Sequence, residues 1–98
     1  MSDITYAEFE IGPDHPALPG HFPGNPVVPG VLILQEVMDG ALRLDVGGTI
    51  KEVVQVKFVS MLKPEQRCQI EYRPGRDGRV RFECQAEGRV IANGLLKS

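Results

Sequence analysis

Residues 12–44 read GPDHPALPGHFPGNPVVPGVLILQEVMDGALRL, a run rich in proline and glycine that leads directly into an apolar one. Ten of the nineteen residues from 12 to 30 are proline or glycine, so this part is predicted to be an irregular loop. Pro29 suits the entry of a helix, and residues 30–44 are predicted to form that helix. Its first turn is apolar on every side, which is typical of a buried helix.

The segments on both sides of this loop and helix have the composition of strands. Residues 4–11 are predicted to form one strand, and residues 50–96 are predicted to form four antiparallel strands. Alternation in residues 50–60 places on one face Val54, Val56 and Phe58. We therefore predict a single α+β domain over residues 1–98, in which one face of an antiparallel sheet packs on one long helix.

Alternation also predicts how two of these strands pair. Both apolar sets must face the same side of the sheet, because a slip of one residue would expose one of them. With a loop at Pro74–Gly78, this condition pairs Tyr72 with Val80, Ile70 with Phe82, and Cys68 with Cys84. Two interpretations of the neighbouring cysteines stay open: small buried hydrophobic residues, or a disulfide.

Composition restricts the class of protein. The net charge of −2 argues against nucleic acid as a partner, and no apolar run approaches the roughly 18 residues of a membrane span. The N-terminus lacks the order of a signal peptide, and two cysteines in such a chain suggest reduced thiols, so we expect a cytoplasmic protein. Two histidines and two cysteines without ligand spacing argue against a zinc site, and we expect neither metal nor cofactor.

Charge is divided unevenly along the chain. Residues 1–49 carry a net charge of −6, and residues 50–98 carry +4. The second half contains a group of five arginines, namely Arg67, Arg73, Arg76, Arg79 and Arg81. Two interpretations stay open: a solvated strand face, or a surface for an acidic partner.

The run His21–Leu34, HFPGNPVVPGVLIL, resembles the signature H-F-P-G-x-P-V-x-P-G-V-L of the FabA/FabZ-type β-hydroxyacyl-acyl-carrier-protein dehydratases. Residues 56–58 (VKF) and 63–65 (KPE) resemble the second strand and turn of that family, so the likeness spans most of the chain. The resemblance implies a hotdog fold, in which a sheet wraps around one central helix, usually in a dimer. It also implies action on acyl thioesters of acyl carrier protein or CoA, in fatty acid or polyketide- or polyene-type synthesis.

The chemistry of dehydration explains the residue types. The reaction removes a proton from Cα of a β-hydroxyacyl thioester and expels hydroxide from Cβ. A base that titrates near neutrality suits the first step, and by resemblance this base is His21. A backbone N–H at a helix N-terminus can stabilise the developing enolate, and the resemblance gives this role to the Gly30 amide. The resemblance also places the substrate beside Phe22, Pro29, Gly30 and Val31.

One position departs from the family pattern. The family carries Glu or Asp fourteen residues after its histidine, and this chain has Gln35. An amide cannot transfer a proton at neutral pH, and loss of a general acid typically lowers the rate by about 10²–10⁴. On a regular helix Glu36 is turned about 100° away, and Asp39 lies about 6 Å further along the axis. Only a local shift of the helix brings Glu36 into the site.

Gln35 leaves three functions open. The first is a dehydratase of reduced or altered activity. The second is a non-catalytic acyl-binding subunit, or a heterodimer subunit that lends His21 or scaffolding to a partner carrying the acid. The third is a hotdog thioesterase in which Gln35 orients a water, although the HFPG loop argues against it.

The resemblance also implies partners. In the family, the histidine and the acid of one site come from different subunits, so Gln35 of one chain is expected to face His21 of another. The second subunit is either another copy of this chain or a dehydratase homologue. The family docks acidic acyl carrier proteins on positive surface near the tunnel mouth, and the arginines are candidates for that surface.

Overall fold

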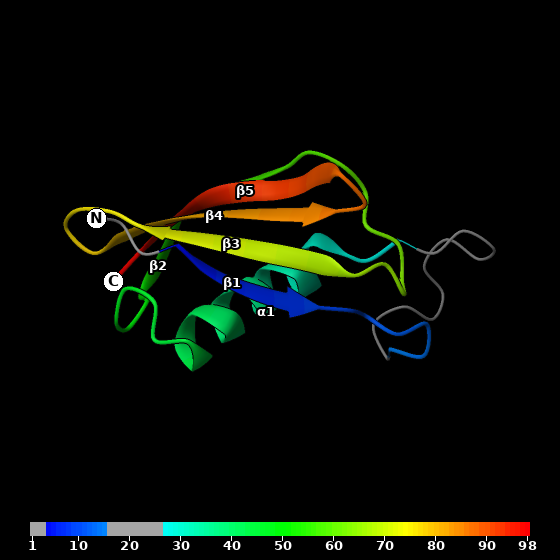
Figure 1. Ribbon diagram of the computed structural model, residues 1–98, viewed down its shortest axis with the longest axis horizontal. Helices are drawn as coiled ribbons and strands as arrows, with labels where there is room; N and C mark the ends of the chain where they lie inside the picture. Colours follow the sequence, from blue (N-terminus) through cyan, green and yellow to red (C-terminus); the bar gives the residue numbers. More distant parts are fainter. Residues whose placement is uncertain (1–3, 16–26) are drawn as a thin grey trace.

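One helix and five strands make up the part of the chain that the structure, a computed structural model, describes: residues 4–15 and 27–98. In chain order they are β1 (Thr5–Phe9), α1 (Gly30–Arg43), β2 (Glu52–Phe58), β3 (Cys68–Pro74), β4 (Arg79–Ala86) and β5 (Arg89–Lys97). The strands form one antiparallel sheet in the order β1-β3-β4-β5-β2. The helix lies against one face of this sheet (Figure 1).

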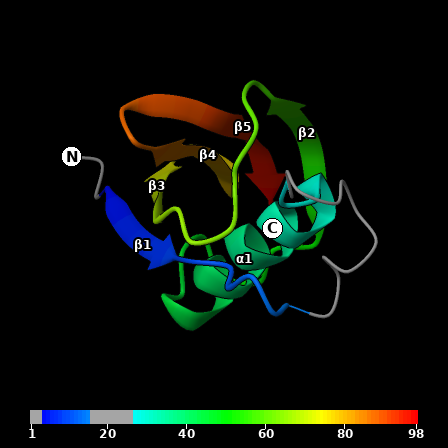
Figure 2. The same cartoon turned by 90° about the vertical axis from the view of Figure 1, so that its right-hand side faces the viewer.

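The sheet curves around α1, as the view along the helix shows (Figure 2). The helix separates β1 from β2 in the sequence, and these two strands occupy opposite edges of the sheet. The predicted α+β architecture, with a sheet wrapped around one central helix as in the hotdog fold, is confirmed. No helix in the described ranges is long and apolar enough to cross a membrane.

The predicted elements match the observed ones to within a few residues. The helix ends at Arg43 rather than at 44, because Leu44 leaves helical geometry as the C-cap, with φ −93° and ψ 1°. The first strand covers Thr5–Phe9 rather than 4–11. The four later strands fall where alternation predicted them, between residues 52 and 97.

The core lies between α1 and the concave face of the sheet. The helix contributes its buried side chains at Leu32, Ile33, Val37 and Ala41. The sheet contributes alternate residues of β3 and β4, among them Ile70, Tyr72, Val80 and Phe82. The side chains between them, including the arginines, therefore point away from the helix.

A tyrosine ties the sheet to the middle of the helix. The buried Tyr72 hydroxyl donates a hydrogen bond to the Val37 carbonyl at 2.7 Å. Gly40 makes room for it, because a Cβ at that position would overlap the tyrosine oxygen. Burial is the main cause that raises the pKa of Tyr72 above its ordinary value. The hydroxyl therefore stays protonated and continues to donate.

This contact predicts that the effect of Gly40→Ala on the free energy of unfolding depends on the Tyr72 hydroxyl. Gly40→Ala is expected to destabilise the wild-type protein by about 1–3 kcal/mol, because the new methyl group displaces the Tyr72 hydroxyl. In a Tyr72→Phe background the nearest ring atom leaves room, so the same change should be neutral or stabilising by up to about 1 kcal/mol through helix propensity. Urea unfolding of the four proteins measures both effects. An equal effect of Gly40→Ala in the two backgrounds would contradict the contact.

The predicted pairing of β3 with β4 is wrong by two residues. Tyr72 lies opposite Phe82 rather than Val80, and Val80 pairs with Pro74. The reason is a turn centred one residue later than predicted, on Asp77 rather than Arg76, where Asp77 and Gly78 both adopt positive φ, 57° and 73°. Because the error is even, the apolar residues still face the helix, as predicted.

The corrected pairing changes the relation between the cysteines. Cys84 lies opposite Ile70, so Cys68 is its diagonal neighbour rather than its direct partner. Both are fully buried and free, so of the two interpretations the structure has buried thiols and no disulfide between them. The hydrogen bond that the Cys84 thiol donates to Cys68, followed by burial, raises the pKa of Cys84. These thiols act as small core residues.

The prediction for β2 also needs correction. Val54, Val56 and Phe58 do not share one environment, because the register shifts between Val53 and Gln55. Val53 and Val56 pack against the core, whereas Val54 and Phe58 are 46% and 49% exposed. This irregularity lies in an edge strand, where bulges are common. It leaves apolar side chains on an unpaired edge of the sheet.

Candidate active site at the start of the helix

The first turn of α1 offers backbone donors. Pro29 is the N-cap in extended geometry, and its carbonyl accepts the N–H groups of Leu32 and Ile33 at 3.0 and 3.4 Å. The N–H groups of Gly30 and Val31 find no acceptor among residues 4–15 and 27–98. The first turn also carries no acidic side chain to use them. These donors stand at the positive end of the helix dipole and can stabilise a developing oxyanion.

Two backbone hydrogen bonds hold the ends of the Pro/Gly-rich loop. Before the loop, the Ile11 carbonyl accepts the N–H of Glu65 at 2.8 Å. After it, the N–H of Val28 donates to the Leu62 carbonyl, also at 2.8 Å. Both ends are therefore fixed to the same short segment between β2 and β3. This segment sets where the loop leaves the domain and where the helix begins.

Two of the predicted site residues, His21 and Phe22, lie outside the described residues. Their predicted roles as base and substrate contact therefore stay predictions. Pro29, Gly30 and Val31 lie together at the start of α1, as predicted. Val31 is 62% exposed, which is unusual for an apolar residue of the helix that forms the core.

Phe58 is a residue of this region that the sequence did not single out. Its ring atoms lie 2.8–3.1 Å from the position that a Cβ on Gly30 would occupy. The resemblance places the substrate beside Gly30. In the structure, the described neighbour that leaves no room for a Cβ at this position is the Phe58 ring. The other part of the ring stays open to solvent, since Phe58 is half exposed. The only sequence signal for it was its place in the family-like VKF segment.

Gln35 lies on the exposed side of α1, one turn after Val31. Its side chain makes no hydrogen bond to any residue that the structure describes. The amide is therefore free to meet a substrate or another subunit. Nothing within this part of the protomer accounts for a glutamine at this position.

Glu36 does not replace the missing carboxyl group. The helix is regular from Gly30 to Arg43, without a shift that would turn Glu36 toward the side of Gln35. Glu36 is half-buried on another flank, where its charge, with that of Asp39, adds to the main effect of burial in raising the Tyr72 pKa. In the described helix, Glu36 therefore does not compensate for the lack of an acid at position 35.

Exposed apolar side chains extend from this region along α1 and β2. They occur on the outer side of α1, on the edge strand β2 and just after it, and include Val31, Leu42, Val54, Phe58, Val59 and Met61. The edge of β2 also leaves backbone hydrogen-bonding groups unpaired. Such a surface is typical of contact with another protein chain or an apolar ligand.

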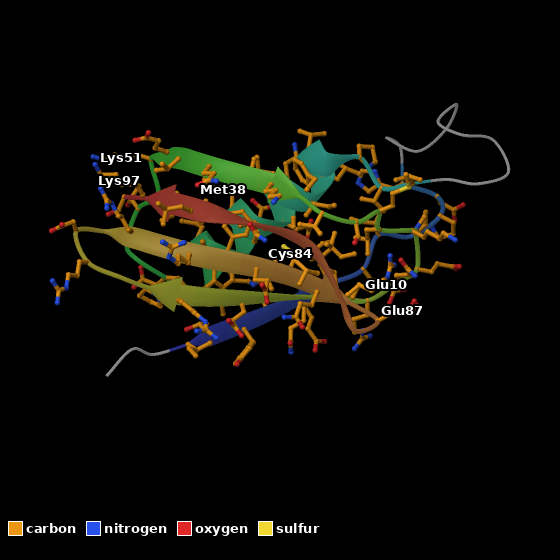
Figure 3. All side chains as sticks on the ribbon, turned by 90° about the horizontal axis from the view of Figure 1, so that it is seen from above. Glu10, Met38, Lys51, Cys84, Glu87 and Lys97 are labelled. Carbon is orange, nitrogen blue, oxygen red and sulfur yellow. The ribbon has the colours of Figure 1, made fainter. Side chains whose placement is uncertain are left out.

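The arginines do not surround the start of the helix. Arg67 pairs with Glu8 at 3.3 Å near the beginning of β3, so it stands apart from the other four. Those four lie near the β3–β4 turn, at the end where Lys51 and Lys97 are also found (Figure 3). Phe58, which packs on Gly30, is level with Cys84 in the sheet, about 17 Å along the strand from Arg79. Of the four arginines, the three that lie in strands, Arg73, Arg79 and Arg81, also point to the face away from α1.

The sequence matches a known family over nearly its whole length. The profile described as ApeI-like, ApeI dehydratase, covers residues 2–95. Among curated proteins, the chain is 30% identical over 95 residues to the 3-hydroxyacyl-[acyl-carrier-protein] dehydratase FabZ of Caldicellulosiruptor saccharolyticus. That match covers 85% of this chain and 68% of the relative.

Solved structures share the fold. The dehydratase heterocomplex ApeI:P from Xenorhabdus doucetiae superposes with a TM-score of 0.79 and 23% identity, over 96% of this chain and 85% of that one. A mutant form of the fluoroacetyl-CoA-specific thioesterase FlK gives a TM-score of 0.63 and 13% identity, over 97% and 82% of the two chains. At these identities the structures establish the hotdog fold alone.

Proposed function

Because the chain belongs to the ApeI-like dehydratase family, we propose that it acts on β-hydroxyacyl thioesters, with His21 as the base. In this proposal the Gly30 amide binds the thioester oxygen and Phe22, Pro29 and Val31 contact the acyl group. Gln35 occupies the position of the usual acid. The observation that carries the proposal is the pair of N–H donors at Gly30 and Val31, for which the described residues provide no acceptor.

The proposed reaction divides into two bond changes. The imidazole of His21 takes the proton from Cα, and the negative charge that develops on the thioester oxygen is stabilised by the Gly30 N–H. The Cα=Cβ double bond then forms as the Cβ–O bond breaks. Gln35 can donate a hydrogen bond to the departing oxygen but supplies no proton. The proton that completes water must come from solvent or another group, and the His21 imidazolium returns its proton to solvent, so slow turnover is expected.

A second subunit completes the proposed site. Gln35 faces outward on α1, and the apolar side chains of α1 and β2 are exposed beside it. Pairing along β2 would cover these side chains and place Gln35 of one subunit near His21 of the other. A homologue that carries an acid at this position would restore the missing proton donor. The ApeI:P neighbour, itself a dehydratase heterocomplex, supports a heterodimer as one form of this assembly.

The carrier of the acyl group is proposed from the relatives. The FabZ relatives are named for 3-hydroxyacyl groups on acyl carrier protein. We propose acyl carrier protein or CoA thioesters as substrates, in fatty acid or polyene-type synthesis. A thioesterase is the second candidate, since Gln35 is free to orient a water and a thioesterase shares the fold. The match to a dehydratase family favours the first.

One assay separates these functions. Purified protein is incubated with β-hydroxyacyl-CoA and with β-hydroxyacyl carrier protein, and enoyl thioester and free thiol are both measured. We expect slow formation of the enoyl thioester without thiol release, and none with His21→Ala. Thiol release without enoyl product would identify a thioesterase. If the chain alone forms neither product, and a dehydratase homologue that binds this chain is no faster with it than without it, catalysis is excluded and an acyl-binding role remains.

A further inference from the structure

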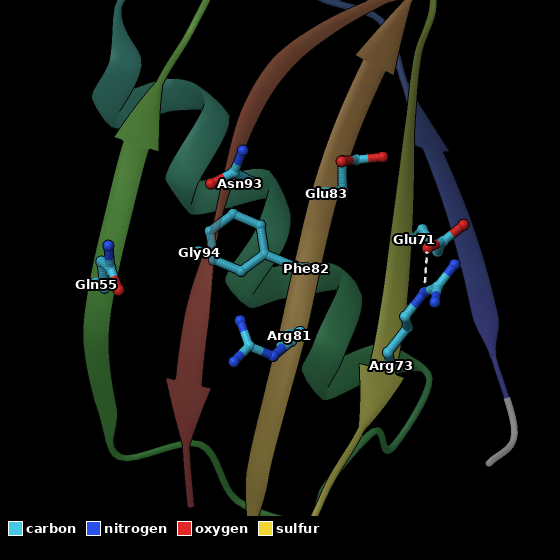
Figure 4. A pocket seen from close by; sticks show the side chains of 8 residues that line it. All are labelled: Gln55, Glu71, Arg73, Arg81, Phe82, Glu83, Asn93 and Gly94. Carbon is cyan, nitrogen blue, oxygen red and sulfur yellow. Dashed lines mark hydrogen bonds and ion pairs between the residues drawn. The ribbon is translucent and has the colours of Figure 1, made fainter.

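On the face of the sheet opposite α1, positively charged side chains lie next to one another. Arg73 of β3 lies directly opposite Arg81 of β4, and Arg79 lies directly opposite Lys97 of β5. Like charges placed opposite each other on neighbouring strands destabilise a sheet. Figure 4 shows Arg73 and Arg81 on the outer side of the strands, with α1 behind the sheet.

The cations are poorly compensated within the protomer. Arg73 is hydrogen-bonded to Glu71 at 2.5 Å, and this bond raises the pKa of Arg73. The side chains of Arg76, Arg79 and Arg81 form no ion pair with any described residue. The repulsion among them is therefore retained in the isolated protomer. A surface that keeps such repulsion lowers the stability of the free protein.

The same residues border a hollow of about 320 Å³ at the β3–β4 turn. It is lined by Arg73, Pro74, Gly75, Arg76, Arg79, Arg81 and Leu95. Leu95 gives the hollow an apolar wall between the charged side chains. Positive charge around a small apolar wall fits a partner that presents carboxylates next to an aliphatic side chain.

We propose that Arg73, Arg76, Arg79, Arg81 and Lys97, here called the cation surface, bind an acidic protein segment that carries several carboxylates. Charge complementarity is the basis, since the partner would remove the repulsion that the sheet retains. The cations are exposed and spread over three strands and a turn, which fits an extended acidic segment better than a single phosphate. The surface lies on the face away from α1, so the proposal does not depend on the proposed catalysis.

Poly-L-glutamate is a suitable probe, and its binding is measured by fluorescence anisotropy at low salt. The double variant Arg73→Gln/Arg81→Gln is expected to bind it at least about tenfold more weakly than the wild type. The matched control is Arg67→Gln/Arg89→Gln, which loses the same charge outside the cation surface and should change affinity less than about twofold. Equal weakening by both double variants, or no binding by the wild type, would overturn the proposal.

A single charge reversal gives a second, opposite readout. Arg81→Glu replaces a repulsive pair with an attractive one opposite Arg73, so the melting temperature of the free protein should rise by about 1–5 °C. The same variant should lose binding of poly-L-glutamate. A lower melting temperature would overturn the premise of retained repulsion. Inorganic pyrophosphate is added as a competitor. If it displaces poly-L-glutamate at a concentration of charge far below that of the polymer, the surface is a phosphate site instead.

Discussion

Gln35→Glu is expected to raise the rate at which the purified chain dehydrates a β-hydroxyacyl thioester by about 10²–10⁴. The carboxyl group would supply the proton that the departing hydroxide needs, which an amide cannot do. Gln35 is exposed and has no hydrogen-bond partner among the described residues, so the substitution should leave the fold unchanged. Enoyl thioester formation under single-turnover conditions measures the gain.

Glu36→Gln is the matched control for this prediction. If Glu36 were the acid of this chain, its loss would abolish the residual turnover. Its half-buried place on another flank of the helix predicts no such effect. A Gln35→Glu protein that is folded and no faster than the wild type would mean that position 35 is not where the hydroxide leaves.

The central helix could be predicted because local chemistry determines it. Proline and glycine exclude regular structure before Pro29, and the apolar run after it has no polar side on its first turn. The apolar faces of β3 and β4 could be predicted for a similar reason. Burial of one face specifies the parity of the register, and parity is what alternation reports.

The exact register and the irregularity of β2 could not be predicted. A shift of two residues conserves the pattern of burial, so only the geometry of the turn at Asp77 and Gly78 distinguishes the two pairings. The shift between Val53 and Gln55 in an edge strand likewise leaves no mark on composition. Both depend on backbone conformations that several residue types can adopt.

The candidate site was predictable in part. The resemblance located Gly30, and the structure places it at the start of α1, with an N–H that no described residue accepts. The packing of Phe58 on Gly30 joins residues that are far apart in the sequence, and no local pattern reveals it. In the proposed assembly the outward position of Gln35 directs it toward a second chain, which a single sequence does not contain.

The central claim is that one site is shared between two subunits, His21 from one and residue 35 from the other. Subunit mixing tests it with wild-type chains and chains that carry both His21→Ala and Gln35→Glu. Different tags on the two chains allow mixed dimers to be purified. In a shared arrangement, one site of the mixed dimer combines His21 with the introduced carboxyl group, and the other site has neither.

The decisive measurement is the dehydration rate of that mixed dimer. We predict about half the rate of the Gln35→Glu homodimer, at least about 50-fold above either parent homodimer, because neither parent combines the base with the acid. A mixed dimer no faster than the average of its two parents would contradict a shared site.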